Sequence, residues 1–467
     1  MTGTPRLVVA APSSGHGKTA VAVGLIAALA ARGLTIGGFK IGPDYVDAGY
    51  LGLASGRAGR NLDPRLVGGG TLPGLFLHGA AGADVSVVEG TMGLFDGLSG
   101  RSDEENTAQV AGMLRAPVVL VVDAAAMGQS VAALVHGFRA YDELLWLGGV
   151  VLTRVSSDRH EQILRAALEE IGVPVLGALR RNDLSPLPPR QHGLVPVVDR
   201  AVDAVRAVRR LGERMMDRLD LDRILALARS APPLTADRWS PEQAVGGRSD
   251  APTSPAPSDA TGYATESLPG EPPVVALAGA GEYAYSYPET AELLTAAGAR
   301  VVTFDPLRDE RLPEGTRAMV VGGGFPEAFA DELSANRILR DEVVALARAN
   351  GPIYAENAGL LWLVKDLDGR EMCGVFDASA QTTNMLVLGY REATARASSS
   401  TVKVGSRVLG HKHHRTMVSP RAGDNAAWQW QGGRPEGFIW RRVHASFLNV
   451  HWAGYPEMAS RFVAAIG

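Results

Sequence analysis

Two kinds of segment alternate along the first 200 residues, and they differ in how their apolar positions are spaced. Short runs that are apolar throughout are each followed by a longer stretch with the spacing of a helix. Strands without polar positions are buried on both faces, so their alternation with helices favours a parallel sheet covered on both sides. We therefore predict an α/β fold with strands at residues 6–11, 84–90, 116–124, 147–155 and 174–180 and helices at residues 18–32, 130–145 and 159–172.

The pattern changes after a helical stretch at residues 197–230. The segment that follows is dense in Pro, Ser, Gly and Ala and has no apolar period, which is typical of a flexible linker. A second α/β alternation then runs to the last residue. We predict a first domain at residues 1–230, a linker at residues 231–272 and a second domain at residues 273–467.

The composition narrows the class of protein. The chain has 467 residues, 46% of them hydrophobic and 21% charged, with a formal net charge of −4. The small net charge gives no indication of a nucleic-acid partner, and the apolar run at residues 18–32 is too short to span a membrane. The single cysteine, Cys373, excludes an intrachain disulfide and a cysteine-rich metal site. We expect a soluble, cytoplasmic protein.

The first predicted strand runs into the sequence Pro-Ser-Ser-Gly-His-Gly-Lys-Thr, and a helix follows. Backbone N–H groups of such a loop bind phosphate oxygens, Lys18 would reach the β- and γ-phosphates, and the Thr19 hydroxyl would bind Mg²⁺. Pro12 replaces the usual first glycine of this pattern. The alternative is a glycine-rich turn with a chance Lys-Thr pair, and the flanking strand and helix argue against it. The predicted nucleotide-binding residues are Ser13, Ser14, Gly15, Gly17, Lys18 and Thr19.

Carboxylates follow the next predicted strands. Asp44 and Asp47 come after Lys40, Glu89 ends an apolar strand, and Asp96 lies among glycines. The carboxyl ends of parallel strands meet at one edge of the sheet, beside the phosphate loop. We therefore predict that these four acids bind Mg²⁺ or orient a second substrate. The alternative for any one of them is a solvated loop acid.

Long motifs occur in both halves of the chain. They are PSSGHGKT, FKIGPDYVDAGY, GRNLDP, VVEGTMGLFDG, LTRV and LGALRRNDLSPLPPRQHGLVP in the first half, and VVTFDPLRDERLPEG, GGGFPEAFADELSAN, YAENAGLLWL, MCGVF, LVLGYREA and VLGHKHHRT in the second. Together these motifs resemble the cobyrinic acid a,c-diamide synthases. The resemblance implies an ATP-binding synthetase domain, similar to dethiobiotin synthetase with its P-loop and parallel sheet, that phosphorylates side-chain carboxylates of a corrin precursor. It also implies a class I glutamine amidotransferase-like α/β domain that supplies ammonia.

The resemblance also implies roles for individual residues. Thr19, Asp44 and Glu89 would bind Mg²⁺, and Asp123, at the end of a predicted strand, would lie on the nucleotide side of the site. The residues implied for catalysis are Lys18, Asp44, Asp47, Glu89 and Asp96.

The chain departs from the family in its second half. Asn357 stands in the strand–turn–helix where the family has its nucleophilic cysteine, and Asn449 stands where we align the first histidine of the C-terminal motif. Lys412 replaces a glutamate of the Gly-His-Glu-Phe-His motif, and Thr153 replaces a base-contacting asparagine of the first half.

Glutamine hydrolysis requires a thiolate and a base that activates it, and neither amide supplies them. We therefore predict that the glutaminase is inactive. Cys373 lies 16 positions beyond Asn357 in a strand-like segment, where a core role is expected. The oxyanion-hole residues Gly323 and Gly324 remain, so the fold should persist, and the altered shell could bind an amide, dock a partner or cover the first domain.

His411, His413 and His414 lie close together in the sequence. Strand alternation would put His411 and His413 on one face, a candidate pair of metal ligands. The alternative, which we favour, is a structural or former active-site role.

The leading hypothesis is an ATP- and Mg²⁺-dependent amide ligase that uses free ammonia or ammonia from a separate glutaminase. Its substrate would be a corrin-type or other polycarboxylate. The alternatives are a paralogue that amidates a different carboxylate and a non-catalytic nucleotide-binding partner or regulatory protein. Neither a nucleic acid nor a membrane is expected as a partner, and a homodimer is compatible with the class.

Overall fold

A computed structural model describes residues 3–97, 106–184, 187, 189–190, 193–194, 201–246, 271–279, 286–324 and 326–467. The chain forms two compact units, Met1–Trp239 and Ser240–Gly467. Most of the predicted linker, at residues 247–270, lies outside the described residues, as does part of the motif near residue 190.

The first unit contains a seven-stranded sheet in the order β3-β2-β4-β1-β5-β6-β7. Every pairing within this sheet is parallel, as the apolar strands predicted. Its strands are β1 Arg6–Ala10, β2 Ile36–Ile41, β3 Arg60–Leu62, β4 Val85–Glu89, β5 Val118–Asp123, β6 Leu147–Val155 and β7 Val175–Arg180, and a separate pair is β8 Pro189–Arg190 and β9 Gly193–Leu194.

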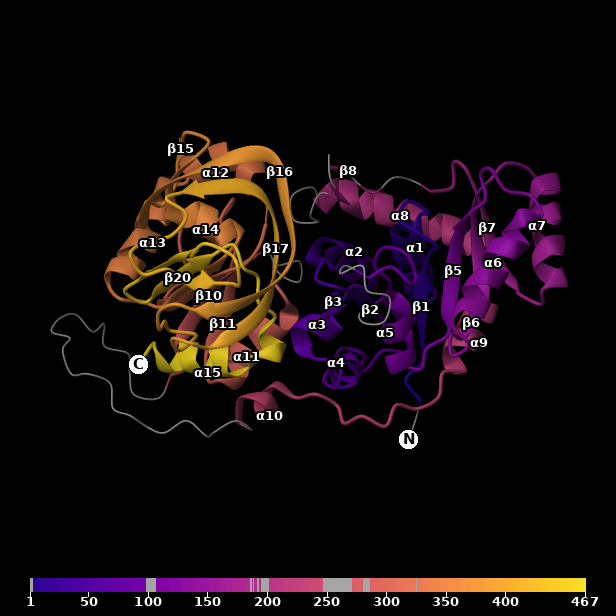
Figure 1. The fold of residues 1–467 in the computed structure, drawn as a ribbon, viewed down its shortest axis with the longest axis horizontal. Coiled ribbons are helices and arrows are strands. Elements are labelled where there is room, and N and C mark those ends of the chain that lie inside the picture. The colour runs from indigo at the N-terminus through magenta and orange to yellow at the C-terminus, as the bar shows by residue number, and fades with distance from the viewer. Residues whose placement is uncertain are drawn as a thin grey trace. The chain divides into compact units, whose positions relative to one another are not determined.

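The helices of the first unit are α1 Lys18–Ala31, α2 Tyr45–Ser55, α3 Pro64–Val67, α4 Leu72–Gly79, α5 Thr107–Met113, α6 Ser130–Tyr141, α7 Asp158–Glu170, α8 Ala201–Arg218 and α9 Leu221–Arg229. The crossovers through α1 and α2 lead toward the β3 edge, whereas those through α5, α6 and α7 lead toward the β7 edge. Because such crossovers are right-handed, the two groups cover opposite faces. Helix α8 packs on α1 and α2 (Figure 1). The direction of the crossovers reverses at β1, so the loop after β1 lies where ligands bind in such sheets.

The second unit has two sheets. Its helices are α10 Pro241–Gly246, α11 Pro288–Ala296, α12 Ala330–Ala335, α13 Arg337–Arg348, α14 Ala358–Leu363 and α15 Glu457–Ala464, with 3₁₀ turns η2 Pro326–Ala328 and η3 Trp452–Gly454. The first sheet has the order β11-β10-β12-β13-β20-β19 and is parallel except at β19. Its strands are β10 Val274–Ala278, β11 Arg300–Phe304, β12 Thr316–Val321, β13 Ile353–Glu356, β19 Phe438–Trp440 and β20 Val443–Ser446.

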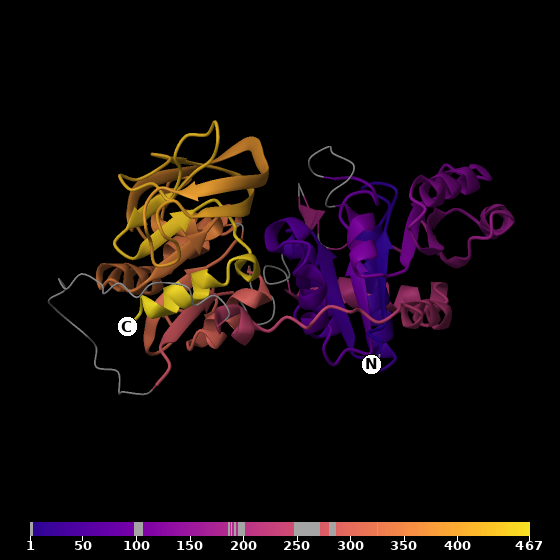
Figure 2. The same ribbon diagram turned by 60° about the horizontal axis from the view of Figure 1, so that its bottom comes forward.

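The second sheet of this unit is built around a long antiparallel ribbon. Its strands are β14 Val364–Leu367, β15 Arg370–Glu371, β16 Phe376–Ala395, β17 Arg407–Ser419 and β18 Trp428–Gln429. Strands β16 and β17 pair along most of their length with one irregularity in register. The ribbon lies beside the six-stranded sheet, as Figures 1 and 2 show from two directions.

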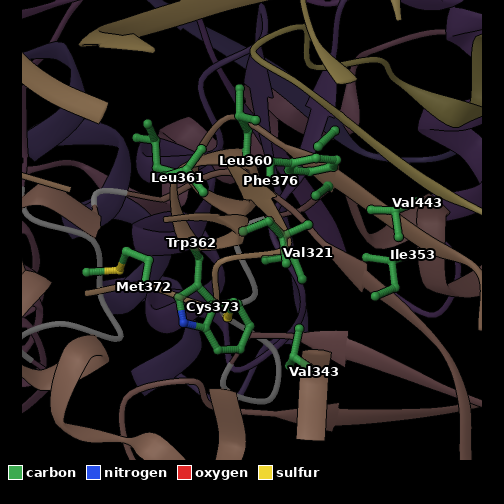
Figure 3. Packing of buried hydrophobic residues seen from close by; sticks show 14 of the residues in the cluster. Val321, Val343, Ile353, Leu360, Leu361, Trp362, Met372, Cys373, Phe376 and Val443 are labelled. Atoms are coloured by element: carbon green, nitrogen blue, oxygen red, sulfur yellow. The ribbon is translucent and has the colours of Figure 1, made fainter. Parts of the chain in front are cut away.

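The core of the second unit encloses Cys373 (Figure 3). This residue lies between β15 and β16, so the expectation of a strand-like segment is wrong, but its backbone N–H donates to the Trp362 carbonyl and its side chain is buried. Burial raises the pKa of the Cys373 thiol well above its usual value, which suits a core residue and not a nucleophile. Within the described part of the chain, no helix combines the length and hydropathy needed to span a bilayer.

Candidate functional site

The loop between β1 and α1 has the backbone of an anion site. Gly15 and Gly17 have φ angles of 91° and 89°, a region that glycine enters without strain. Gly17 is the N-cap of α1, and no side chain caps this helix. The N–H groups of the first turn are therefore available to an anionic ligand. Ser13 and Ser14 are exposed in the same loop.

Lys18, at the start of α1, reaches across the site to the loop after β4. Its Nζ donates to the carbonyl oxygen of Met92 at 2.8 Å. Met92 has a φ angle of 48°, which turns the chain at this point. Burial lowers the pKa of Lys18 to about 8, and the nearby positive charge of Lys40 acts in the same direction. Lys18 is thus mainly a cation at neutral pH but titrates not far above it.

Lys40 is the centre of the charged network. Lys40 and Glu89 are register partners in β2 and β4, and Lys40 Nζ lies 2.9 Å from Glu89 Oε1. The same nitrogen lies 2.7 Å from Asp47 Oδ2 and 3.2 Å from the Gly90 carbonyl oxygen. Burial alone would lower the pKa of Lys40, but the Asp47 and Glu89 carboxylates outweigh it and raise the pKa above its usual value. Lys40 was not among the predicted site residues, although its place near the end of a strand, like that of Glu89, is a signal for it.

Glu89 also contacts the phosphate loop. The Thr19 hydroxyl donates to Glu89 Oε1 at 2.5 Å, and burial raises the pKa of the Glu89 carboxyl. Glu89 Oε2 is buried without a hydrogen-bond partner, so one oxygen remains to be satisfied by a ligand. A hydroxyl and a carboxylate beside a phosphate loop are the ligands that Mg²⁺ takes in nucleotide sites, with phosphate and water completing the shell. Among the described residues no cluster of three or more His, Cys, Asp or Glu side chains is arranged to hold a metal ion.

The other two predicted acids have a clear local function. Asp44 is the N-cap of α2, where its Oδ1 accepts from the backbone N–H groups of Val46 at 2.8 Å and Asp47 at 3.2 Å. Asp96 accepts from the Gly93 N–H at 2.9 Å and closes the loop that carries Met92. Asp44 therefore holds the backbone of Asp47 in place, and Asp96 holds the loop whose Met92 carbonyl Lys18 contacts. Asp44 and Asp96 are both exposed, so a ligand can also reach them.

A second group of residues ties the phosphate loop to the ends of β5 and β6. The Asp123 N–H donates to His16 Nδ1 at 2.8 Å, and the Thr153 hydroxyl donates to the His16 carbonyl at 3.0 Å. Arg154 donates to Asp123 Oδ2 at 2.6 Å and to the Gly15 carbonyl at 3.2 Å. Arg154 has a φ angle of 55°, an unusual conformation for a long side chain. The loop is thus held in place by side chains, and the buried Thr153 hydroxyl is used inside the protein.

The second unit contains a nucleophile-elbow turn without a nucleophile. Asn357, between β13 and α14, has φ 47° and ψ −99°. Its N–H donates to the Ser446 carbonyl at 2.8 Å, its side-chain Nδ2 donates to the His413 carbonyl at 3.1 Å, and it is 3% exposed. The Gly359 N–H, in the first turn of α14, donates to the Gly322 carbonyl at 3.3 Å, which brings the end of β12 against the elbow. The predicted oxyanion-hole residues that follow β12 are Gly323 and Gly324.

Asn449 lies in the same neighbourhood. Glu356 Oε1 accepts from the Val450 N–H at 2.8 Å, which joins the residue before Asn357 to the residue after Asn449. Asn449 Nδ2 donates to the His411 carbonyl at 3.2 Å. Both asparagine amides therefore donate to backbone carbonyls of β17, and neither can attack a carbonyl or accept a proton near neutral pH.

Lys412 forms a buried ion pair near these asparagines. Its Nζ lies 3.0 Å from Glu436 Oε2, and the two side chains are 4% and 2% exposed. The same nitrogen lies 4.5 Å from the centroid of the Trp430 ring. Burial lowers the pKa of Lys412, and Glu436 acts in the opposite direction. The substitution therefore adds a compensated buried charge, not an isolated one.

The histidine cluster is packed as a set of neutral rings. Burial lowers the pKa of His411 to about 4 and of His414 to about 3. His414 Nδ1 contacts the Thr416 carbonyl at 2.9 Å, and its ring stacks on Phe447 with centroids 3.8 Å apart. The centroids of the His411 and His413 rings lie 6.4 Å apart. The contacts of His414 with Thr416 and Phe447 support a structural role for that residue.

The structure therefore gathers the predicted residues into two groups. Lys18, Thr19, Asp47 and Glu89 surround Lys40 in the first unit, with Asp44 and Asp96 supporting them. In the second unit, Asn357 and Asn449 donate to carbonyls of β17, the strand that carries Lys412.

Comparisons with known proteins find a matching family for each half of the chain. Residues 7–194 match the family described as "CobQ/CobB/MinD/ParA nucleotide binding domain", and residues 283–456 match the family described as "CobB/CobQ-like glutamine amidotransferase domain". The hydrogenobyrinate a,c-diamide synthase of Streptomyces coelicolor is 52% identical over 99% of this chain and 97% of that protein. The protein of the same name from Thermobifida fusca is 46% identical over 99% and 97% of the two chains. The cobyrinate a,c-diamide synthase of Gloeobacter violaceus is 37% identical over 98% and 96%.

Proposed function

The chain belongs to the hydrogenobyrinate and cobyrinate a,c-diamide synthase family, and we propose that it is an ATP- and Mg²⁺-dependent ligase that converts side-chain carboxylates of a corrin precursor into amides. In this proposal residues 1–230 form the synthetase domain and residues 273–467 the amidotransferase-like domain. The observation that carries it is the network in which Lys40 joins Asp47 to Glu89 while Glu89 accepts from Thr19.

The reaction follows from the chemistry of this network. A carboxylate is a poor electrophile, so its oxygen first takes the γ-phosphoryl group of ATP, which gives an acyl phosphate and ADP. Ammonia then attacks the carbonyl carbon, and inorganic phosphate leaves. Lys18 would hold the phosphate oxygens, Lys40 would keep the Asp47 and Glu89 carboxylates in place, and Glu89 and Thr19 would bind the cation. Mg²⁺ would neutralise charge on the phosphates during transfer.

We further propose that the ammonia does not come from glutamine hydrolysis by this chain. The support is the pair of amides at Asn357 and Asn449, which donate to the His413 and His411 carbonyls at 3.1 Å and 3.2 Å. The nitrogen source would be free ammonia or a separate glutaminase.

The test is amide formation from cobyrinic and hydrogenobyrinic acid with ATP–Mg²⁺ and either ammonium or glutamine, followed by mass spectrometry. We expect diamide with ammonium and none with glutamine, and no product with Lys18→Ala in either case. Product with glutamine alone would overturn the proposed loss of the glutaminase. Nucleotide binding without product from any corrin acid would refute the ligase assignment and favour a nucleotide-binding partner protein.

A further inference from the structure

The second unit contains a cavity that the proposed reaction does not use. It lies between the end of β16, the start of β17 and β18, and has a volume of about 890 Å³. Small-molecule sites commonly have volumes of roughly 300–1,000 Å³. The cavity is therefore large enough for a metabolite-sized ligand.

Polar side chains line this cavity without using their hydrogen-bonding groups inside the protein. Arg396 and Arg407 contribute two guanidinium groups, and Gln429 and Gln431 contribute two amides. Within the described part of the chain, no hydrogen bond or ion pair engages these four side chains. Arg396, Arg407 and Gln431 are exposed, so their polar groups are available to a ligand in the cavity.

An aromatic side chain in the cavity lining has two positive charges beside it. Trp430 lines the cavity, and its ring centroid lies 4.5 Å from Lys412 Nζ and 5.5 Å from the Arg421 guanidinium carbon. Glu392 is the one carboxylate among the lining residues. Two arginines and one glutamate thus line the cavity, and Glu436 is already paired with Lys412. The local field therefore favours an anion.

Tyr455 supplies a further donor. Its hydroxyl oxygen accepts from the Leu409 N–H at 2.7 Å, so the phenolic O–H remains to donate to a ligand in the cavity. Burial raises the pKa of the Tyr455 phenol, which keeps this proton in place at neutral pH.

We propose that this cavity binds a small molecule that carries a carboxylate or phosphate group on a planar body. Arg396 and Arg407 would pair with the oxyanion, because guanidinium groups match both anions with two parallel hydrogen bonds. Trp430 would stack on the planar body, and Gln429, Gln431 and Tyr455 would fix its orientation. The site lies wholly in the second unit and is independent of the phosphate loop of the first.

The experiment is isothermal titration of full-length Lys18→Ala protein, in which the phosphate loop is disabled, with phenyl phosphate, benzoate and inorganic phosphate. We expect saturable binding of phenyl phosphate or benzoate, and the better of the two identifies the anion. Arg396→Ala with Arg407→Ala should weaken binding at least tenfold. Trp430→Ala should weaken binding of the aromatic probe more than that of inorganic phosphate.

The matched control is the double variant Arg337→Ala and Arg348→Ala, which removes two exposed arginines of α13 outside the cavity. This variant should bind the probes unchanged, and both it and the Arg396/Arg407 variant should unfold at the same temperature as the parent. No saturable binding of either aromatic probe would overturn the proposal, and so would equal binding by the Arg396/Arg407 variant. The result is independent of ligase activity, because the parent protein of the titration lacks Lys18.

Discussion

Lys40 and Glu89 are register partners near the ends of β2 and β4, and their Nζ and Oε1 atoms lie 2.9 Å apart. Their side chains are 4% and 0% exposed, so the pair is removed from water. Parallel pairing alone brings the two charges together, and the neighbouring Asp47 and Thr19 complete the network. The sheet thus provides a charged site before any ligand binds.

The first prediction follows from this burial. Lys40→Met leaves the carboxylates of Asp47 and Glu89 buried without a counter-charge, and we expect it to lower the free energy of unfolding by about 3 kcal/mol or more. Urea denaturation measures this change. The control is Arg32→Met, which breaks the exposed pair with Asp222 and should cost less than about 1 kcal/mol. Equal losses in the two variants would contradict the buried network.

The second prediction concerns pH. Burial lowers the pKa of Lys18 to about 8, and the protonated ammonium is the form that attracts phosphate. Nucleotide affinity should therefore be constant near neutral pH and fall as pH rises through 8, reaching a roughly tenfold loss one unit above that pKa. Titration of a fluorescent ATP analogue between neutral pH and pH 9 checks this. Lys18→Arg, which stays charged throughout, should remove the fall, and a flat profile in the unaltered protein would contradict the assignment.

The third prediction concerns Arg154, which joins Asp123 to the Gly15 carbonyl. The Arg154 side chain is 47% exposed, so Arg154→Ala should change the free energy of unfolding by less than about 1 kcal/mol. It should still weaken nucleotide binding about five- to tenfold, because the loop loses a bond that fixes its conformation. Binding and denaturation measured on one preparation separate the two effects. A change in stability without a change in affinity would show that Arg154 has only a structural role.

The fourth prediction is acid sensitivity of the second unit. His444 is fully buried, and burial lowers its pKa to about 3. The unfolded chain titrates this residue near pH 6.5 and so binds the proton more readily than the folded chain. Stability contributed by neutral His444 is therefore complete above about pH 6.5 and decreases as pH falls, by about 2 kcal/mol at pH 5. Denaturation at several pH values tests this, and His444→Gln should reduce the slope between pH 5 and 6.5.

Much of the first unit was predictable because its signals are local. Apolar strands that alternate with helices define a parallel sheet, and the glycines, Lys18 and Thr19 mark the loop after β1. Glu89 was also predicted as a site residue, because it lies at the end of an apolar strand. Sequence position did not show that Lys40 lies at the centre of the network, since that depends on which strands are neighbours. The capping of α2 by Asp44 is a local feature, and it was missed because no helix was predicted at residues 45–55.

The second unit was less predictable, because fewer of its features have a local sequence signal. The strand–turn–helix around Asn357 was clear from the sequence, and the structure has it as β13 and α14. The long β16–β17 ribbon was not, because β16 is mainly exposed in its middle part and lacks a continuous apolar pattern. The buried pair of Lys412 and Glu436 joins residues 24 positions apart through tertiary packing, which no local pattern records.

The last prediction uses the preserved elbow. Asn357 retains a backbone with φ 47° and ψ −99°, and Asn449 is linked to it through the Glu356–Val450 bond of 2.8 Å. Asn357→Cys together with Asn449→His should therefore place a thiol and a base in a framework already shaped for them and restore glutamine hydrolysis. We expect glutamate release by the double variant to exceed that of either single variant by about 100-fold or more, since nucleophile and base act as a unit. Adding Cys373→Ser should leave this activity unchanged, because Cys373 is a buried core residue. A double variant that folds and releases no glutamate would show that the pocket itself has closed. Lys412→Glu would then be the next substitution to add.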